Sequence, residues 1–120
     1  MWGTIKRRST DILYSKILRK KRNYTCERCL KREEGGMQVS HFYGRKAETV
    51  RFDDENCDCF CAGCHKYFTE MPALYAEWKK KKMGEKAYKI LMLRAHQMGK
   101  RDDKLMGIIL KKEAKELKII

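Results

Sequence analysis

Four of the six cysteines in this sequence form two Cys-x-x-Cys pairs, at Cys26 and Cys29 and at Cys61 and Cys64. Two residues between cysteines let both sulfurs reach one side of a tight turn, and four thiolates satisfy the tetrahedral preference of Zn²⁺. Four sulfurs leave no open coordination position, so a zinc ion bound there would be structural rather than catalytic. Two disulfide bonds or unrelated thiols are the alternative. We expect a structural zinc site at these four cysteines.

The other two cysteines, Cys57 and Cys59, alternate with an aspartate and a phenylalanine just before the second pair. In a strand this spacing turns both sulfurs to the same face. Cysteine often behaves as a small, buried apolar residue. We therefore expect both side chains to be packed inside the protein. The alternative is that Cys59 replaces Cys61 or Cys64 as a zinc ligand.

Two histidines and an asparagine accompany the cysteine pairs: His41, Asn56 and, directly after Cys64, His65. A neutral imidazole with a pKa near 6.5 can take a proton from water at physiological pH. Phosphodiester hydrolysis needs such an activated water and groups that stabilise charge on the phosphate. His41 is therefore our candidate general base. Taken singly, the three residues have ordinary interpretations, as a hydrogen-bonded core histidine, a turn residue and a neighbour or ligand of the zinc.

The order Cys-x-x-Cys, His, Asn, Cys-x-x-Cys-His over residues 26–66 resembles the HNH, or ββα-metal, nuclease family. The surrounding sequence is similar to the NinG (Rap) recombination nucleases of lambdoid phages, and this similarity fades after Trp78. The segments that carry it are residues 11–29, Ser40–Arg45, Arg51–Asn56 and Cys61–Phe68. The resemblance implies a phage or prophage origin and a role in DNA recombination, on branched or structured DNA.

In that family a strand, a loop, a second strand and a helix hold one catalytic metal ion, so the resemblance implies a bound Mg²⁺ or Mn²⁺. It also implies that His65 is a ligand of this metal. By the same resemblance, Asn56 positions the loop and the imidazole of His41 through hydrogen bonds. The catalytic set would then be His41, Asn56 and His65.

One position departs from the family pattern. Many members carry Asp or His just before the base and use it as a metal ligand, whereas this chain carries Ser40, a neutral and poor ligand. The metal would then depend on His65, Ser40, water and the substrate phosphate, with Asp53 or Asp54 as further candidates. The alternative is a zinc-stabilised DNA-binding module in which catalysis is weak or absent.

Charge favours an anionic partner. Lys and Arg number 29 against 16 Asp and Glu, a net charge of +13. The phosphate backbone of nucleic acid is the usual partner of such an excess, and no segment is apolar enough for a membrane span. The candidate DNA contacts are Arg19, Lys20, Arg45, Lys46, Arg51 and Lys66. The lysines at 79–82 are either a solvated face or further phosphate contacts.

Apolar spacing and capping residues predict the elements that position these groups. We expect a basic helix over 10–21, capped by Ser9 or Thr10, then a cysteine knuckle over 23–36. Strands over 37–43 and 56–60 would flank a polar loop. Three helices would follow, one from Pro72 to Gly84, one over 85–98 and one starting at Asp102 or Asp103. Leu74, Tyr75 and Trp78 should be core residues rather than a base-stacking platform.

The expected fold is α+β, a zinc-stapled ββα-metal centre with an N-terminal basic helix and two to three C-terminal helices. We expect one domain over residues 1–120, divided into a helix (1–24), the centre (25–70) and a helical extension (71–120). Apolar pairs Leu105/Ile109 and Met106/Leu110 allow a homodimer or a protein-interaction adaptor. The absence of a signal-peptide pattern favours a reducing cytoplasm, that of a bacterial host if the chain is phage-encoded. In that compartment the six cysteines are expected to bind metal or remain free thiols rather than form disulfides.

Overall fold

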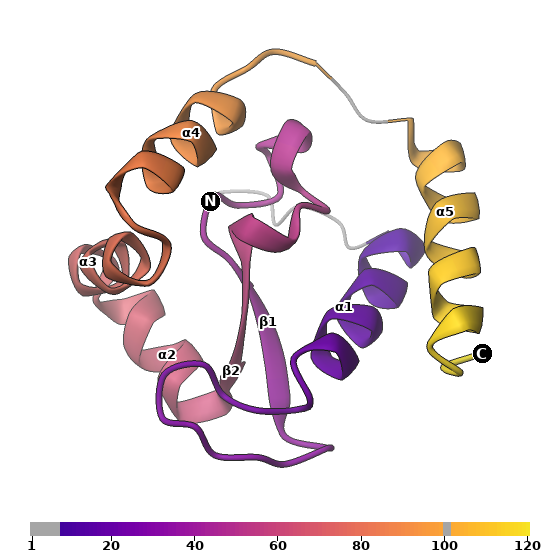
Figure 1. Cartoon of the computed structure of the whole chain (residues 1–120), viewed down its shortest axis with the longest axis horizontal. Helices are drawn as coiled ribbons and strands as arrows, with labels where there is room; N and C mark the ends of the chain where they lie inside the picture. Colours follow the sequence, from indigo (N-terminus) through magenta and orange to yellow (C-terminus); the bar gives the residue numbers. More distant parts are fainter. Residues whose placement is uncertain (1–7, 100–101) are drawn as a thin grey trace, which may run out of the picture.

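The computed structural model describes residues 8–99 and 102–120, and over these ranges the fold is α+β (Figure 1). A two-stranded sheet lies at the centre, with α1 and α5 on one flank and α2, α3 and α4 on the other. The elements are α1 (Ser9–Lys21), β1 (Met37–His41), the 3-10 turns η1 (Glu48–Val50) and η2 (Asp54–Asn56), β2 (Cys57–Cys61), α2 (Ala62–Glu70), α3 (Pro72–Met83), α4 (Glu85–Ala95) and α5 (Asp103–Glu116).

The strands β1 and β2 pair antiparallel, with Met37 opposite Cys61, Ser40 opposite Asp58 and His41 opposite Cys57. All of β2 except Cys61 is buried, because elements of both flanks pack against the sheet. The chain passes from β2 directly into α2, since α2 begins at the residue after Cys61. The order strand, loop, strand, helix expected from the sequence is therefore present.

The N-terminus of α1 differs from the sequence prediction. Its N-cap is Arg8, whose backbone N–H donates to the Asp11 carboxylate at 2.7 Å. Neither Ser9 nor Thr10 caps the helix, and Thr10 instead donates its hydroxyl to Asp103 of α5 at 2.8 Å. The Asp11 carboxylate thus accepts one of the free N–H groups at the helix start and interacts favourably with the helix dipole.

Two apolar clusters hold the flanks to the sheet. In the first, Tyr14, Ile17 and Leu18 of α1 pack with Leu110 of α5 and Cys57 of β2. Met106 joins this cluster, so half of the apolar face expected to mediate dimerisation is used inside the chain. The remaining large apolar side chains of this helix, Leu105, Ile108 and Ile109, are exposed.

The second cluster is aromatic. Phe60 of β2, Phe68 of α2 and Tyr75 of α3 are buried together, with Trp78 packed against them. The rings of Phe68 and Tyr75 stack with centroids 4.9 Å apart and planes at 10°. Tyr75 is therefore core, as predicted, and the other two residues predicted as core, Leu74 and Trp78, are partly buried against this cluster. The cluster fixes α2 and α3 to the strand that ends at Cys61.

The helices of the C-terminal half begin and end close to the residues predicted from the sequence. Pro72 begins α3, and Gly84 ends it with a φ of +84°, a conformation that glycine adopts without strain. Asp102 caps α5 by accepting the Leu105 N–H at 3.1 Å. α4 ends at Ala95, three residues before the predicted limit of 98. None of the described helices is long and apolar enough to cross a bilayer.

Candidate functional site

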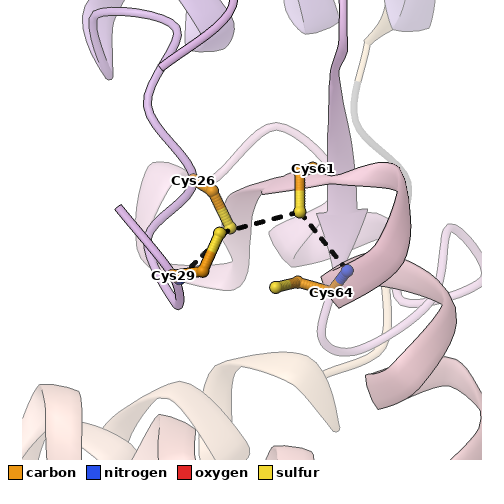
Figure 2. A group of neighbouring side chains, drawn as sticks. All are labelled: Cys26, Cys29, Cys61 and Cys64. Carbon is orange, nitrogen blue, oxygen red and sulfur yellow. Dashed lines mark hydrogen bonds between the residues drawn. The ribbon is translucent and has the colours of Figure 1, made fainter. Parts of the chain in front are cut away.

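The four cysteines of the two pairs meet at one point (Figure 2), where their sulfur atoms all lie within 4.8 Å of one another. Cys26 and Cys29 come from the loop after α1, Cys61 from the end of β2 and Cys64 from the first turn of α2. This cluster could hold a metal ion such as zinc, because four convergent sulfurs are its preferred structural ligands.

Local backbone geometry turns the sulfurs inward. The Cys26 sulfur accepts the N–H of Cys29 at 3.5 Å, and the Cys61 sulfur accepts the N–H of Cys64 at 3.4 Å. Burial opposes ionisation of Cys26, but N–H donors around its sulfur outweigh burial and lower its pKa to about 7. Burial raises the pKa of Cys64. Four thiolates this close repel one another, so a divalent cation is needed for all to ionise.

Cys57 and Cys59 lie outside this cluster and are fully buried, which confirms the expectation that they pack in the interior. Burial raises the pKa of Cys57 to about 12 and that of Cys59 to about 11, so both remain neutral thiols.

A cavity of about 740 Å³ lies beside the sheet, between α1, α2 and α3. It brings together His41 and Ser40 of β1 and His65 of α2, three of the residues predicted from the sequence. Two of the predicted DNA contacts, Arg19 and Arg45, also line it. The remaining lining includes Gln38, Phe42, Thr69 and Tyr75. Its two arginines and two imidazoles suit a phosphate group.

His41 is held by one ring nitrogen. Its Nε2 lies 3.1 Å from the backbone carbonyl oxygen of Arg51, which can only accept, so Nε2 carries the proton and donates it. Nδ1 therefore keeps its lone pair in the neutral ring. Burial and the nearby charge of Arg45 lower the pKa of His41 to about 4, so the ring is neutral at physiological pH.

His65 has the opposite tautomer. Its Nδ1 lies 2.6 Å from Oε1 of Gln38 on β1, so Nδ1 donates and Nε2 keeps its lone pair. Burial lowers the pKa of His65. An imidazole whose second nitrogen donates to an oxygen is the usual arrangement of a metal-ligating histidine. His65 directly follows Cys64, so the position of its backbone depends on the cysteine cluster.

Asn56 is buried and bridges the loop between the strands. Its Nδ2 donates to the carbonyl oxygens of Tyr43 and Val50 at 2.9 and 3.2 Å, and its Oδ1 accepts the Tyr43 N–H at 2.9 Å. Arg51, whose carbonyl holds His41, follows Val50. Asn56 therefore positions the His41 imidazole only indirectly, through the backbone of the loop.

Arg51 does not belong to a DNA-binding surface, and that prediction is corrected. Its side chain is 1% exposed, and its Nε and Nη2 donate to Asp11 at 2.9 and 2.5 Å. Glu48 lies on its other side at 3.4 Å. A buried guanidinium needs such partners, so Arg51 joins α1 to the loop instead of reaching a phosphate.

The other predicted DNA contacts lie outside the cavity lining: Lys46 and Lys66 are exposed and Lys20 is half-buried. The two aspartates proposed as further metal ligands also lie away from the cavity. Asp54 accepts from Tyr14 at 2.7 Å and pairs with Lys21, and Asp53 pairs with Arg94 at 2.9 Å. Both carboxylates form salt bridges, so neither remains a candidate ligand of the catalytic metal.

The lysines at 79–82 do not all lie on a solvated face of the helix. Lys79 is 1% exposed and donates to both oxygens of the buried Asp58, at 2.9 and 3.0 Å. Lys82 donates to Asp58 at 2.9 Å and also to Glu27 of the knuckle. This group was not predicted from the sequence, although an aspartate inside a buried strand is a signal that a cationic partner must exist.

In comparisons with protein-family models, with curated proteins and with solved structures, this chain matched none.

Proposed function

We propose that this protein is a metal-dependent DNA endonuclease of the HNH type, with a structural zinc ion at its four clustered cysteines. The observation that carries the proposal is the pairing of two neutral imidazoles in one basic cavity. His41 keeps a free Nδ1, His65 keeps a free Nε2, and Arg19 and Arg45 line the same space. Such a set supplies a base, a metal ligand and phosphate-binding cations.

In the proposed mechanism, Arg19 and Arg45 bind the phosphate through their guanidinium groups. His41 accepts the proton of the attacking water at Nδ1, while its Nε2 stays bound to the Arg51 carbonyl. The ring must be neutral to accept this proton, and it carries a positive charge after the transfer. A Mg²⁺ or Mn²⁺ ion held by His65 and Ser40 would supply charge stabilisation at the phosphate and the leaving oxygen.

The zinc has a positioning role in this proposal. Cys61 and Cys64 lie at the junction of β2 and α2, and His65 follows in the same turn. Holding these sulfurs to Cys26 and Cys29 therefore fixes the helix that carries His65 against β1, where Gln38 orients its ring. Loss of zinc would remove this constraint together with much of the fold.

DNA is the proposed substrate because a net charge of +13 attracts a polyanion and the cavity is basic. The choice of branched recombination intermediates depends on the resemblance to the phage recombination nucleases. Incubating the zinc-loaded protein with supercoiled plasmid tests the activity. We expect nicking that requires Mg²⁺ or Mn²⁺; a purified, folded protein that leaves the plasmid intact with either metal would rule out the nuclease.

A second candidate is a zinc-stabilised DNA-binding module that does not cleave. The observation in its favour is that, among the described residues, no carboxylate lines the cavity. Hard cations prefer carboxylate oxygens, and this cavity offers one imidazole and one hydroxyl instead. DNA binding without metal-dependent nicking would select this candidate.

A further inference from the structure

The outward side of α5 carries an ordered row of exposed side chains. This helix lies at the edge of the fold, with α1 packed on its inner side (Figure 1). Asp102, Leu105, Ile109 and Lys112 follow one another at steps of three or four residues, so they line one side of the helix. All four are exposed, Leu105 at 53% and Ile109 at 46%. This row, called here the α5 stripe, therefore places two apolar side chains between an acidic and a basic one.

The two charged ends of the α5 stripe have no ionic partner within the part of the chain that the structure describes. Asp102 accepts the Leu105 N–H as the helix cap, and a carboxylate has room for a cation as well. Its neighbour Asp103 differs, because it points toward α1 and accepts from Thr10 and Arg8. Asp102 and Lys112 are thus available to a partner that approaches α5 from outside.

The order acid, apolar, apolar, base is complementary to its own reverse. When two copies of α5 pack antiparallel about a two-fold axis, Leu105 of each copy lies opposite Ile109 of the other. Asp102 of each copy then lies opposite Lys112 of the other, which gives one ion pair at each end of the contact. In a parallel pair Lys112 would face Lys112 instead, and the charges would repel.

We propose that the α5 stripe is the interface with a second copy of this chain, which packs against it antiparallel. Ile108 is 61% exposed beside the stripe and adds apolar area to the contact. The occupant is a second copy because a two-fold contact needs a surface complementary to itself, and the stripe has this property. One helix face is a small interface, so the association is weak and depends on protein concentration.

The exposed apolar side chains of α4 do not offer the same complementarity. Ile90 and Leu93 are exposed there at helical spacing, with Lys86 on the same side one turn before Ile90. This row has a basic end but no acidic end, so its reverse does not match it. The α4 face therefore serves as the control surface for tests of the α5 stripe.

Sedimentation equilibrium of the zinc-loaded protein, without DNA and at physiological ionic strength, tests the pairing. We expect a monomer–dimer equilibrium that Ile109→Glu abolishes and that Leu93→Glu, on α4, leaves unchanged. Both positions are exposed, so both variants should fold, with zinc content and the melting curve as checks. A parent protein that stays monomeric at every concentration, or a dimer that Ile109→Glu does not weaken, would overturn the proposal.

Charge variants test the antiparallel arrangement separately. Lys112→Glu places two carboxylates at each end of the contact and should raise the dimer Kd about tenfold or more. Adding Asp102→Asn, which keeps a capping side chain, should recover part of this loss. Lys111→Glu makes the same change of charge outside the stripe and is the matched control. A Kd that Lys112→Glu lowers relative to Lys111→Glu would show a parallel pair and overturn the arrangement.

The proposal does not depend on the nuclease. None of the four residues of the α5 stripe lines the cavity beside the sheet. A monomeric protein that nicks plasmid would contradict only the pairing, and a dimer that does not nick would contradict only the proposed function.

Discussion

The Nε2 proton of His41 is bound to the backbone carbonyl oxygen of Arg51, 3.1 Å away, while the Arg51 side chain forms a buried ion pair with Asp11. One residue therefore fixes the ring of the candidate base with its backbone and joins the loop to α1 with its side chain. This relationship explains why Arg51 is unavailable to DNA and yet matters for the site. It also fixes the tautomer of the neutral ring, with the proton on Nε2.

The first prediction concerns pH. A base must be neutral, and burial together with Arg45 lowers the pKa of His41 to about 4. The cleavage rate should thus stay nearly constant as pH falls from 7 to about 5, whereas an unperturbed histidine would lose activity around pH 6.5. Arg45→Gln removes one of the two main causes and should move the acidic limb to higher pH. Cleavage rates measured against pH at saturating metal and constant zinc content check this prediction. A loss of activity centred near pH 6.5 in the parent protein would contradict the lowered pKa of His41.

The second prediction concerns the buried ion pair. Burial acts against the charged form of Asp11, but hydrogen bonds from Arg51 and from the Arg8 N–H, together with the charges of Arg51 and Arg45, outweigh burial and hold the pKa of this carboxyl below its usual range. Arg51→Met leaves a buried carboxylate without its main partner and should lower the free energy of unfolding by about 3–5 kcal/mol. Urea denaturation measures the loss. Lys80→Met, at an exposed position on α3, is the control and should change stability little.

The third prediction concerns metal removal. Cys26→Ser should abolish stoichiometric zinc and unfold the domain, because ligand loss and folding are linked in a small zinc-stapled chain. Cys59→Ala also removes a buried sulfur but lies outside the cluster. This control should retain zinc and lose only the modest stability expected of a core truncation. Zinc content by elemental analysis and a circular dichroism melt distinguish the two; a folded, zinc-free parent protein would refute the site.

The fourth prediction concerns DNA affinity. If Arg19 and Arg45 each contact one phosphate, changing either to Gln should reduce the slope of log affinity against log salt by about 1 on duplex DNA. Lys115→Gln, on the exposed side of α5 and away from the cavity, is the control. Equal slopes for all the variants would mean that the cavity does not face the DNA backbone.

Local signals predicted most of the fold. Proline at the start of α3, glycine at its end and the Asp102 cap act within a few residues, so they can be recognised without the structure. The cysteine spacing likewise predicted which four sulfurs converge.

Contacts between distant residues were missed. Arg51 and Lys79 are charged side chains that normally remain in solvent, and their main partners in the interior, Asp11 and Asp58, lie far away in the sequence. The hydrogen bonds of Tyr75 with Ser40 and Asp58 were not predicted for the same reason. Its aromatic ring was predicted as core, but its hydroxyl partners come from β1 and β2.

The most direct test of the central claim is plasmid nicking by His41→Ala compared with the parent protein, at saturating Mn²⁺ and with zinc content and DNA affinity measured on the same preparations. If His41 is the base, the rate should fall by about 10² to 10⁴ while zinc and DNA binding remain. A second purification step, with unchanged relative rates, excludes a contaminating nuclease. Undiminished cleavage by His41→Ala would show that His41 is not the base and would contradict the central claim.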